Sequence, residues 1–193
     1  IGGIHDYITG SFMLTHMDPL YTQDETSLIL SRIGREEWPE PAKTEDGKRY
    51  WSGKNLFSIC LPEGLDISYK SSICQKCDVC KKEDCEFDSY VVIRNGKLLK
   101  GTIDEKALGA FKGIILDKIA RDFGSNEARL FLEKAIKMAV SSIMIHGFST
   151  SIDDEDIPLD AKMQIQELLQ DATKNVRGYV DAFNNGTLET MPG

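Results

Sequence analysis

The spacing of apolar side chains predicts helices at the start of the chain. The first segment carries apolar residues at roughly helical intervals, namely Ile4, Tyr7, Ile8, Phe12 and Leu14. Gly10 lies inside this segment, and the lack of a side chain there indicates close packing against a neighbouring element. Thr22 and Glu25 have the spacing of a capping box, which predicts that a second helix begins there and ends at Gly34.

The middle of the chain has the pattern of a small antiparallel sheet. Tyr90–Ile93 is rich in strand-forming residues, Asn95-Gly96 is the favoured pair for a two-residue hairpin turn, and Leu98-Leu99 follows it. A further strand is predicted where residues alternate, at Ile67, Tyr69 and Ser71. Residues 35–49 are polar and contain two prolines and a glycine, so we expect a surface loop there.

The pattern becomes helical again from Asp104 onward. One predicted helix presents an apolar face and stops at Gly124, and Ser125 is expected to cap the next helix, which ends at Gly147. The acidic run 153–156 marks a boundary, and Pro158 suits the first turn of a last long helix.

These elements together predict an α+β fold: helices with a small antiparallel sheet and a cysteine metal loop, followed by a helical extension. We expect one domain over residues 1–150, which contains the metal loop at 72–86, and a second over residues 151–193.

Composition narrows the class of protein. The chain has 193 residues with 23 basic and 31 acidic side chains, a net charge of −8, which argues against a diffuse basic surface for nucleic acid. The longest apolar stretch, Ala135–Phe148, is too short to span a bilayer, and no secretory signal is recognisable, so we expect a cytoplasmic protein without membrane association. The ends at Ile1 and Gly193 indicate a piece of a longer protein.

Four of the five cysteines form the strongest chemical signal. Cys74, Cys77, Cys80 and Cys85 lie within twelve residues, and thiolates at such short spacing supply the tetrahedron that structural Zn²⁺ requires. An iron–sulfur cluster and four free thiols remain alternatives, although a ferredoxin motif would continue with a different spacing to a Cys-Pro pair. Cys60 is expected to be a buried apolar residue in a short helix.

No catalytic residue is predicted. The histidines His5, His16 and His146 are dispersed, and none has a partner at the spacing of a metal site or a catalytic triad. The run Asp153–Asp156 lacks the ligand layout of a calcium loop. Phosphate-binding loops and nucleophile motifs are also missing from the sequence.

Several segments resemble the largest subunit of multisubunit DNA-directed RNA polymerase, in the order of that family. Residues 2–15 resemble the segment shortly after the catalytic aspartate loop, and residues 96–107 resemble the family's hairpin and following turn. The sequence at 146–154 is similar to the junction of the pore and funnel domains, and 186–193 to the middle of the funnel's helical hairpin. The cysteine loop is similar to the archaeal form, the A′ subunit.

The resemblance implies a non-catalytic part of a nucleotidyltransferase: the pore region and the start of the funnel. That region would line the secondary channel, through which nucleoside triphosphates and the transcript-cleavage factor enter, and the implied partners are the other polymerase subunits, DNA and RNA. The family's Asn-Ala-Asp-Phe-Asp-Gly-Asp loop, which holds Mg²⁺, would precede Ile1, so no catalytic residue is carried over.

Two other classes are weighed against this interpretation: a free-standing zinc-binding nucleic-acid module, which the acidic balance opposes, and an iron–sulfur electron carrier. If the chain is an excised part of a larger assembly, we expect exposed apolar surface on the first helix around Phe12 and Leu14.

Overall fold

The computed structural model describes residues 2–75, 77–111 and 113–188. The chain divides into two compact units, Ile1–Phe148 and Ser149–Gly193, which we call unit 1 and unit 2. No helix among the described residues is both long enough and apolar enough to cross a membrane.

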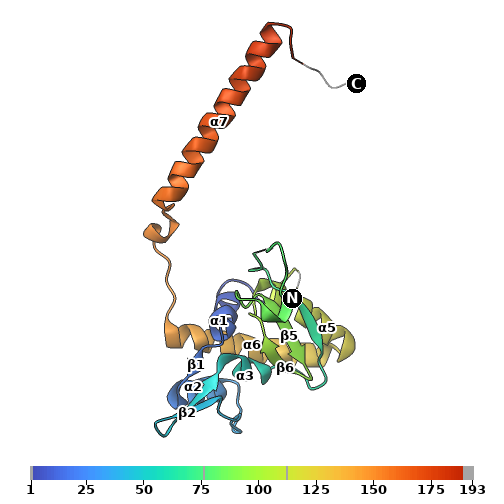
Figure 1. Ribbon diagram of the computed structural model, residues 1–193. Helices are drawn as coiled ribbons and strands as arrows, with labels where there is room; N and C mark the ends of the chain where they lie inside the picture. Colours follow the sequence, from blue (N-terminus) through green and yellow to red (C-terminus); the bar gives the residue numbers. More distant parts are fainter. Residues whose placement is uncertain (1, 76, 112, 189–193) are drawn as a thin grey trace. The chain divides into compact units, whose positions relative to one another are not determined.

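Unit 1 combines helices and short strands, which confirms the α+β class (Figure 1). Its elements in chain order are α1 (Asp6–Thr15), β1 (Leu20–Tyr21), α2 (Gln23–Arg32), β2 (Lys43–Glu45), β3 (Lys48–Ser52), α3 (Gly53–Ser58), β4 (Ile67–Lys70), the 3-10 turn η1 (Lys82–Asp84), β5 (Tyr90–Arg94), β6 (Lys97–Lys100), α4 (Glu105–Leu108), α5 (Ile114–Asp122) and α6 (Ser125–His146). Unit 2 contains the 3-10 turn η2 (Ile152–Glu155) and the long helix α7 (Leu159–Asn184).

The described strands form two antiparallel three-stranded sheets, whereas the sequence pattern predicts one small sheet. The second sheet has the order β4-β5-β6, with Ile67 opposite Ile93 and Ile93 opposite Leu98. Asn95 and Gly96 both have positive φ, 47° and 71°, as a type I′ hairpin turn requires. The predicted hairpin is therefore confirmed.

The first sheet, in the order β1-β3-β2, corrects the prediction of a loop at 35–49. Strands β2 and β3 pair with Lys43 opposite Tyr50 and are joined at Asp46-Gly47, whose φ values are also positive. The pattern of the sequence concealed this hairpin because β2 is exposed along its whole length, so its residues do not alternate between apolar and polar.

Helix ends follow local chemistry in most places. Both hydrogen bonds of the Thr22 and Glu25 capping box are present at the start of α2. Helix α6 begins at Ser125, but its N-cap is Gly124 and no side chain caps it, so the predicted role of Ser125 is wrong. Residue Gly147 ends α6, as expected.

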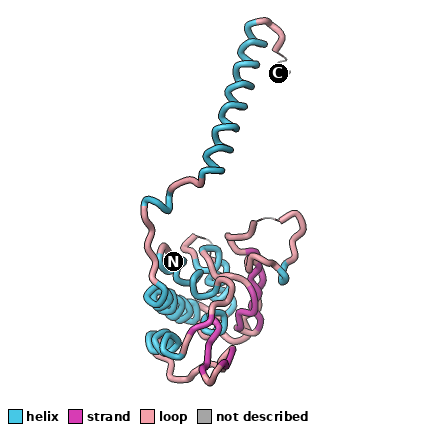
Figure 2. Tube along the Cα trace, turned by 60° about the vertical axis from the view of Figure 1, so that its left-hand side comes forward, coloured by secondary structure: helices cyan, strands magenta, loops and turns pink. Residues whose placement is uncertain are grey.

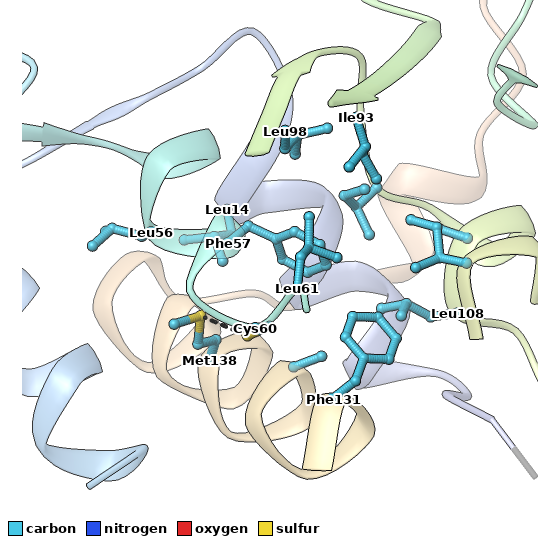
Figure 3. Close-up of a cluster of buried hydrophobic side chains, with 14 of the residues drawn as sticks. Leu14, Leu56, Phe57, Cys60, Leu61, Ile93, Leu98, Leu108, Phe131 and Met138 are labelled. Carbon is cyan, nitrogen blue, oxygen red and sulfur yellow. Dashed lines mark hydrogen bonds between the residues drawn. The ribbon is translucent and has the colours of Figure 1, made fainter. Parts of the chain in front are cut away.

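One apolar core holds unit 1 together (Figure 3). Phe57 on α3 packs edge-to-face on Phe131 of α6, with ring centroids 6.3 Å apart, and the Cys60 sulfur lies 3.3 Å from the Met138 sulfur. Cys60 is buried, as predicted, although it lies just after α3. Its burial raises the pKa of the thiol to about 12, so the group stays a neutral apolar residue.

Helices α1 and α6 pack closely against each other, and Gly10 explains why they can. A Cβ added at Gly10 would lie 2.1 Å from the carbonyl oxygen of Ala139. Leu14, on the same helix, is completely buried in the core. The prediction of exposed apolar surface at Leu14 is therefore wrong, because α6 covers that face of α1.

Candidate metal centre

The cysteine loop, residues 71–89, connects β4 to β5 and is fastened where it leaves and rejoins the sheet. The backbone N–H and the hydroxyl of Ser71 both donate to the Ser89 carbonyl, each over 2.9 Å. The backbone N–H of Ser72 donates to the carboxylate of Asp104. The two ends of the loop are therefore held together by the sheet and by the start of α4 (Figure 2).

Lysine side chains fasten the second half of the loop. The ammonium of Lys100 on β6 donates to the Glu83 carbonyl over 2.8 Å, within η1. Lys81 forms an ion pair with Glu86 across the same turn. Both contacts lie on the Cys85 side of the loop.

The four cysteine side chains line one hollow of about 180 Å³. Cys77 and Cys80 are exposed, whereas Cys74 and Cys85 are partly buried. Little apolar packing orders this part of the chain, since Val79 is 77% exposed and Phe87 41% exposed. The loop therefore has thiols on a shared surface and hardly any core of its own.

The pKa values of the Cys80 and Cys85 thiols both lie below the ordinary value for cysteine. The backbone N–H of Lys82 and then the ammonium of Lys70 lower the pKa of the Cys80 thiol. The hydroxyl of Ser89, 3.1 Å from the Cys85 sulfur, lowers the pKa of that thiol, and the N–H groups of Ser89 and Phe87 add to the effect. Donors directed at sulfur stabilise the thiolate, which is the form that binds metals.

The four cysteines have the right chemistry for zinc, but their side chains are not arranged as a metal site. A tetrahedral site needs four sulfurs about 2.3 Å from one point. Among the residues that the structure describes, no three or more His, Cys, Asp or Glu side chains are close enough together to hold a metal ion. The cysteines share a hollow without converging on one point, so zinc, iron–sulfur and free-thiol interpretations all remain predictions.

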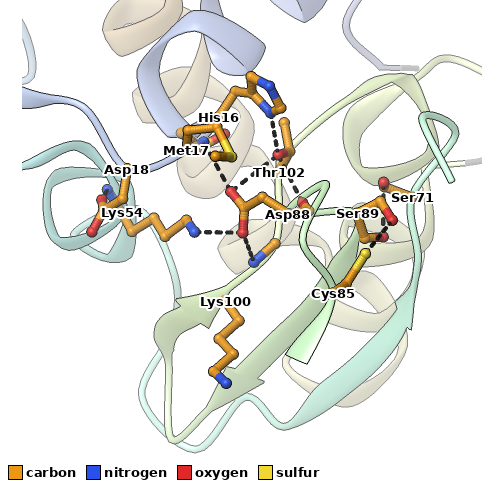
Figure 4. A network of polar contacts seen from close by, with 12 residues as sticks. His16, Met17, Asp18, Lys54, Ser71, Cys85, Asp88, Ser89, Lys100 and Thr102 are labelled. Carbon is orange, nitrogen blue, oxygen red and sulfur yellow. Dashed lines mark hydrogen bonds and ion pairs between the residues drawn. The ribbon is translucent and has the colours of Figure 1, made fainter. Parts of the chain in front are cut away.

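A half-buried carboxylate just after the cysteines was not found by sequence analysis. Asp88 accepts from the Lys54 ammonium over 2.7 Å, from the Gly101 N–H over 2.9 Å and from the Met17 N–H over 3.0 Å (Figure 4). Its φ is positive, 48°, and its own N–H donates to the Cys85 carbonyl. Asp88 thus ties the end of the cysteine loop to α3, to the end of β6 and to the segment after α1.

Two of the three histidines have side-chain contacts within unit 1. His16 lies 3.0 Å from the hydroxyl of Thr102 through Nδ1 and stacks on Phe12. His146 lies 3.2 Å from the hydroxyl of Tyr21 through Nε2, and His5 is the N-cap of α1. None of them adds a ligand to the cysteine loop among the described residues.

Comparison with known proteins identifies the class to which this fold and loop belong. A family profile described as RNA polymerase Rpb1, domain 3, matches residues 1–155. The chain belongs to this family, and the resemblance noted from the sequence is confirmed.

Relatives along the whole chain are archaeal. This chain is 47% identical over 194 residues to a protein of Methanocaldococcus jannaschii. It is 46% identical over 194 residues to one of Methanococcus vannielii, and both relatives are named DNA-directed RNA polymerase subunit Rpo1N. A third, from Thermoplasma acidophilum, bears the same name and is 42% identical. All three alignments cover 100% of this chain but only 14%, 22% and 22% of those relatives. The chain therefore corresponds to a limited segment of much longer proteins.

Proposed function

We propose that the chain serves transcription as the pore region and the start of the funnel of an archaeal RNA polymerase largest subunit. The observation that carries this proposal is the similarity over the entire chain to proteins named DNA-directed RNA polymerase subunit Rpo1N. In this proposal the parent enzyme transfers nucleotides in the cytoplasm, and the catalytic Mg²⁺ is bound by aspartates outside this chain. The chain itself contributes structure to the enzyme and no catalytic residue.

The fold of unit 1 supports a scaffolding role. It has one apolar core, and polar contacts such as that of Lys54 with Asp88 join its elements to one another. A self-contained module of this kind keeps its form inside a large assembly. In the proposal, one face of unit 1 lines the secondary channel, which admits nucleoside triphosphates, the transcript-cleavage factor and the RNA 3′ end.

Unit 2 is proposed as the first arm of the funnel's helical hairpin. Helix α7 has no buried residue, and its apolar side chains recur at helical spacing, for example at Leu168, Leu169, Val176, Val180 and Phe183. After α7 the N–H of Thr187 donates to the Ala182 carbonyl and Gly186 has φ 68°, the geometry with which a helix ends and its chain turns away. The next part of the parent polypeptide would cover the apolar stripe.

The channel assignment can be tested in an assembled archaeal polymerase whose largest subunit contains this sequence. Stalled complexes that have slid backward would carry a photoreactive nucleotide at the RNA 3′ end, and the cross-linked peptides would be mapped by mass spectrometry. We expect cross-links to unit 1 in backtracked complexes and fewer in complexes that have not moved back. Cross-links confined to other segments of the polymerase in both states would refute the assignment.

We also propose that Cys74, Cys77, Cys80 and Cys85 bind one structural Zn²⁺. Support comes from their spacing, from the hollow that they share and from the donors around two of the sulfurs. The four sulfurs would have to come closer together to complete the tetrahedron. A site of four thiolates has no open position for water or substrate, so its role would be to order the loop.

Substituting one ligand tests this proposal. Cys77→Ser should lower the zinc content measured by elemental analysis, while the helical circular dichroism stays nearly unchanged, because the core of unit 1 does not include the loop. Cys60→Ser, at the buried cysteine outside the loop, is the matched control and should retain zinc. One equivalent of tightly held zinc in Cys77→Ser would show that the four-cysteine assignment is wrong.

A further inference from the structure

Two asparagines of this chain precede a glycine, and the turns in which they lie are held in different ways. The pairs are Asn95-Gly96, between β5 and β6, and Asn185-Gly186, at the end of α7. The other four asparagines are followed by larger residues. An asparagine before glycine is chemically vulnerable, because glycine has no Cβ to obstruct the approach to its backbone nitrogen.

The reaction at such a pair needs water as its single co-reactant. The backbone nitrogen of the glycine attacks the side-chain amide carbon of the asparagine and loses its proton. The departing amide nitrogen takes up that proton and leaves as ammonia, so that a succinimide ring forms. Water then opens the ring at either carbonyl: attack at the side-chain carbonyl gives aspartate, and attack at the main-chain carbonyl gives isoaspartate.

A neighbouring segment holds both reacting groups of the pair between β5 and β6. The N–H of Gly96 donates to the Leu65 carbonyl over 3.0 Å, so the attacking nitrogen is tied to that segment. The side-chain oxygen of Asn95 accepts from the Gly64 N–H over 3.0 Å, so the amide group under attack is tied as well. The backbone N–H of Asn95 donates to the Asp66 carboxylate over 2.7 Å. Ring closure therefore requires this turn to leave the segment first.

Close packing leaves the nitrogen of Gly96 little room. Gly96 is buried, and a Cβ added there would lie 2.5 Å from the carbonyl oxygen of Pro62. The turn cannot change its shape without displacing the backbone beside it, so the packing adds to the protection by the hydrogen bonds.

The turn after α7 holds its reacting groups by local contacts. Asn185 is the C-cap residue of α7, with φ −86° and ψ −1°, and both Asn185 and Gly186 are exposed. The Gly186 N–H donates to the Phe183 carbonyl over 3.1 Å, a bond at the end of the helix. A Cβ added at Gly186 would meet no described atom within 4 Å. Helix ends open at little cost in free energy, so the nitrogen of Gly186 is released far more often than that of Gly96.

We propose that Asn185 is a site of spontaneous modification, which converts to aspartate and isoaspartate under conditions in which the folded turn protects Asn95. Either product places a carboxylate at the C-terminal end of α7, where the helix dipole disfavours negative charge. Isoaspartate also adds one carbon to the main chain before Gly186. The added carbon displaces the N–H groups of Gly186 and Thr187 from the carbonyls that accept their hydrogen bonds.

The test follows both asparagines in the full 193-residue chain during incubation in warm, mildly alkaline buffer. Peptides that contain Asn95 or Asn185 are quantified by mass spectrometry, and isoaspartate is detected by enzymatic methylation of its carboxylate. Asn185 should be converted at least about tenfold faster than Asn95, because ring closure at Asn95 must first break two hydrogen bonds to another segment. In urea both asparagines should react at similar rates, and incubation continues until the sample in urea has reacted.

Substitution of Asp66 tests the protection directly. Asp66→Ala removes the acceptor of the Asn95 N–H and should speed the conversion of Asn95 several-fold, with the rate at Asn185 unchanged. Glu63→Ala, which removes an exposed carboxylate from the same segment, is the matched control and should leave both rates unchanged. Circular dichroism verifies that each variant remains folded.

Two results would overturn the proposal. Equal or faster conversion of Asn95 in the folded chain would mean that its contacts give no protection. An Asn185 that stays intact in the folded chain but reacts in urea would mean that the turn after α7 protects it as well. An unchanged rate at Asn95 in Asp66→Ala would refute protection by that contact.

Discussion

Unit 1 and unit 2 are both rich in helix, but unit 1 buries many of its apolar side chains and unit 2 exposes them. In unit 1, α6 buries Phe131 and Met138 in the core, with Phe131 packed on Phe57 of α3, whereas in unit 2 the apolar residues of α7, such as Leu168 and Phe183, lie exposed. An isolated amphipathic helix gains little stability from its own hydrogen bonds. Unit 1 is therefore stabilised by its own core. Helix α7 instead exposes an apolar surface of the kind that packs against another part of a protein.

The largest expected effect comes from removing an aromatic ring from the core. Phe57→Ala should lower the free energy of unfolding of unit 1 by about 3–5 kcal/mol, because it leaves a cavity beside Phe131. Phe183→Ala on α7 removes an equal ring that is 70% exposed, and it should change that free energy by less than about 0.5 kcal/mol. Urea unfolding followed by tryptophan fluorescence reports unit 1 alone, since Trp38 and Trp51 both lie there.

Similar decreases in the free energy of unfolding for Phe57→Ala and Phe183→Ala would contradict this difference between the two units. They would mean that α7 contributes to the stability of the core, or that the core tolerates the cavity.

The next largest effect is expected from a half-buried charge. Asp88→Asn should cost about 2–3 kcal/mol, because the ammonium of Lys54, whose side chain is 9% exposed, would lose its counter-charge. Asp156→Asn in unit 2 is the matched control: its pair with Lys162 spans 3.9 Å and is well exposed, so a change below about 0.5 kcal/mol is expected. Both variants would be measured by the same urea titration, and equal costs would contradict the assigned roles.

Two glycines inside helices give a third contrast. Gly10→Ala should destabilise unit 1 by about 1–3 kcal/mol, because the new methyl group would strike the backbone of α6 at Ala139. Gly178→Ala on α7 meets nothing within 4 Å and should favour the helix by about 1 kcal/mol. Thermal melts followed by circular dichroism should shift in opposite directions, and a shift in the same direction would remove the argument for close α1–α6 packing.

The smallest effect appears only in alkaline solution. Burial raises the pKa of Tyr21 from 10.0 to about 12, so between these values the folded chain keeps a proton that the unfolded chain has lost. This contribution is complete below pH 10 and is lost as the pH rises through 12, a decrease of at most about 2.7 kcal/mol for a shift of two pKa units. Tyr21→Phe should make this part of the pH profile less steep, although the buried Cys60 thiol still contributes to it, whereas Tyr179→Phe on α7 should leave the profile unchanged.

Local sequence signals predicted local structure well. The capping box at Thr22, the turn at Asn95-Gly96 and the close packing at Gly10 each depend on a few neighbouring residues or on one steric fact, and the structure confirms them. The hairpin of β2 and β3 was missed although Asp46-Gly47 is also a favoured turn pair, because its strands do not alternate.

Features that depend on distant parts of the chain were predicted poorly. Leu14 is buried where α1 packs against α6, which lies more than a hundred residues further along the chain. The residues next to Leu14 do not indicate this packing. The contacts of Asp88 with Met17, Lys54 and Gly101 likewise join four separate segments. The cysteine spacing identified candidate ligands, but the hollow that they share and the hydroxyl of Ser89 beside the Cys85 sulfur required the structure.

The two connections within the second sheet have consequences for the rate at which the chain folds. Strands β5 and β6 meet across a two-residue turn, and hairpins of that kind form within about 1–10 μs. Strand β4 can join them only after the whole 71–89 loop has closed, and closing a longer loop carries a larger entropic barrier. We therefore expect the β5–β6 ribbon to form first and β4 to dock late. A metal ion bound by the cysteines would shorten the free loop and speed that late step.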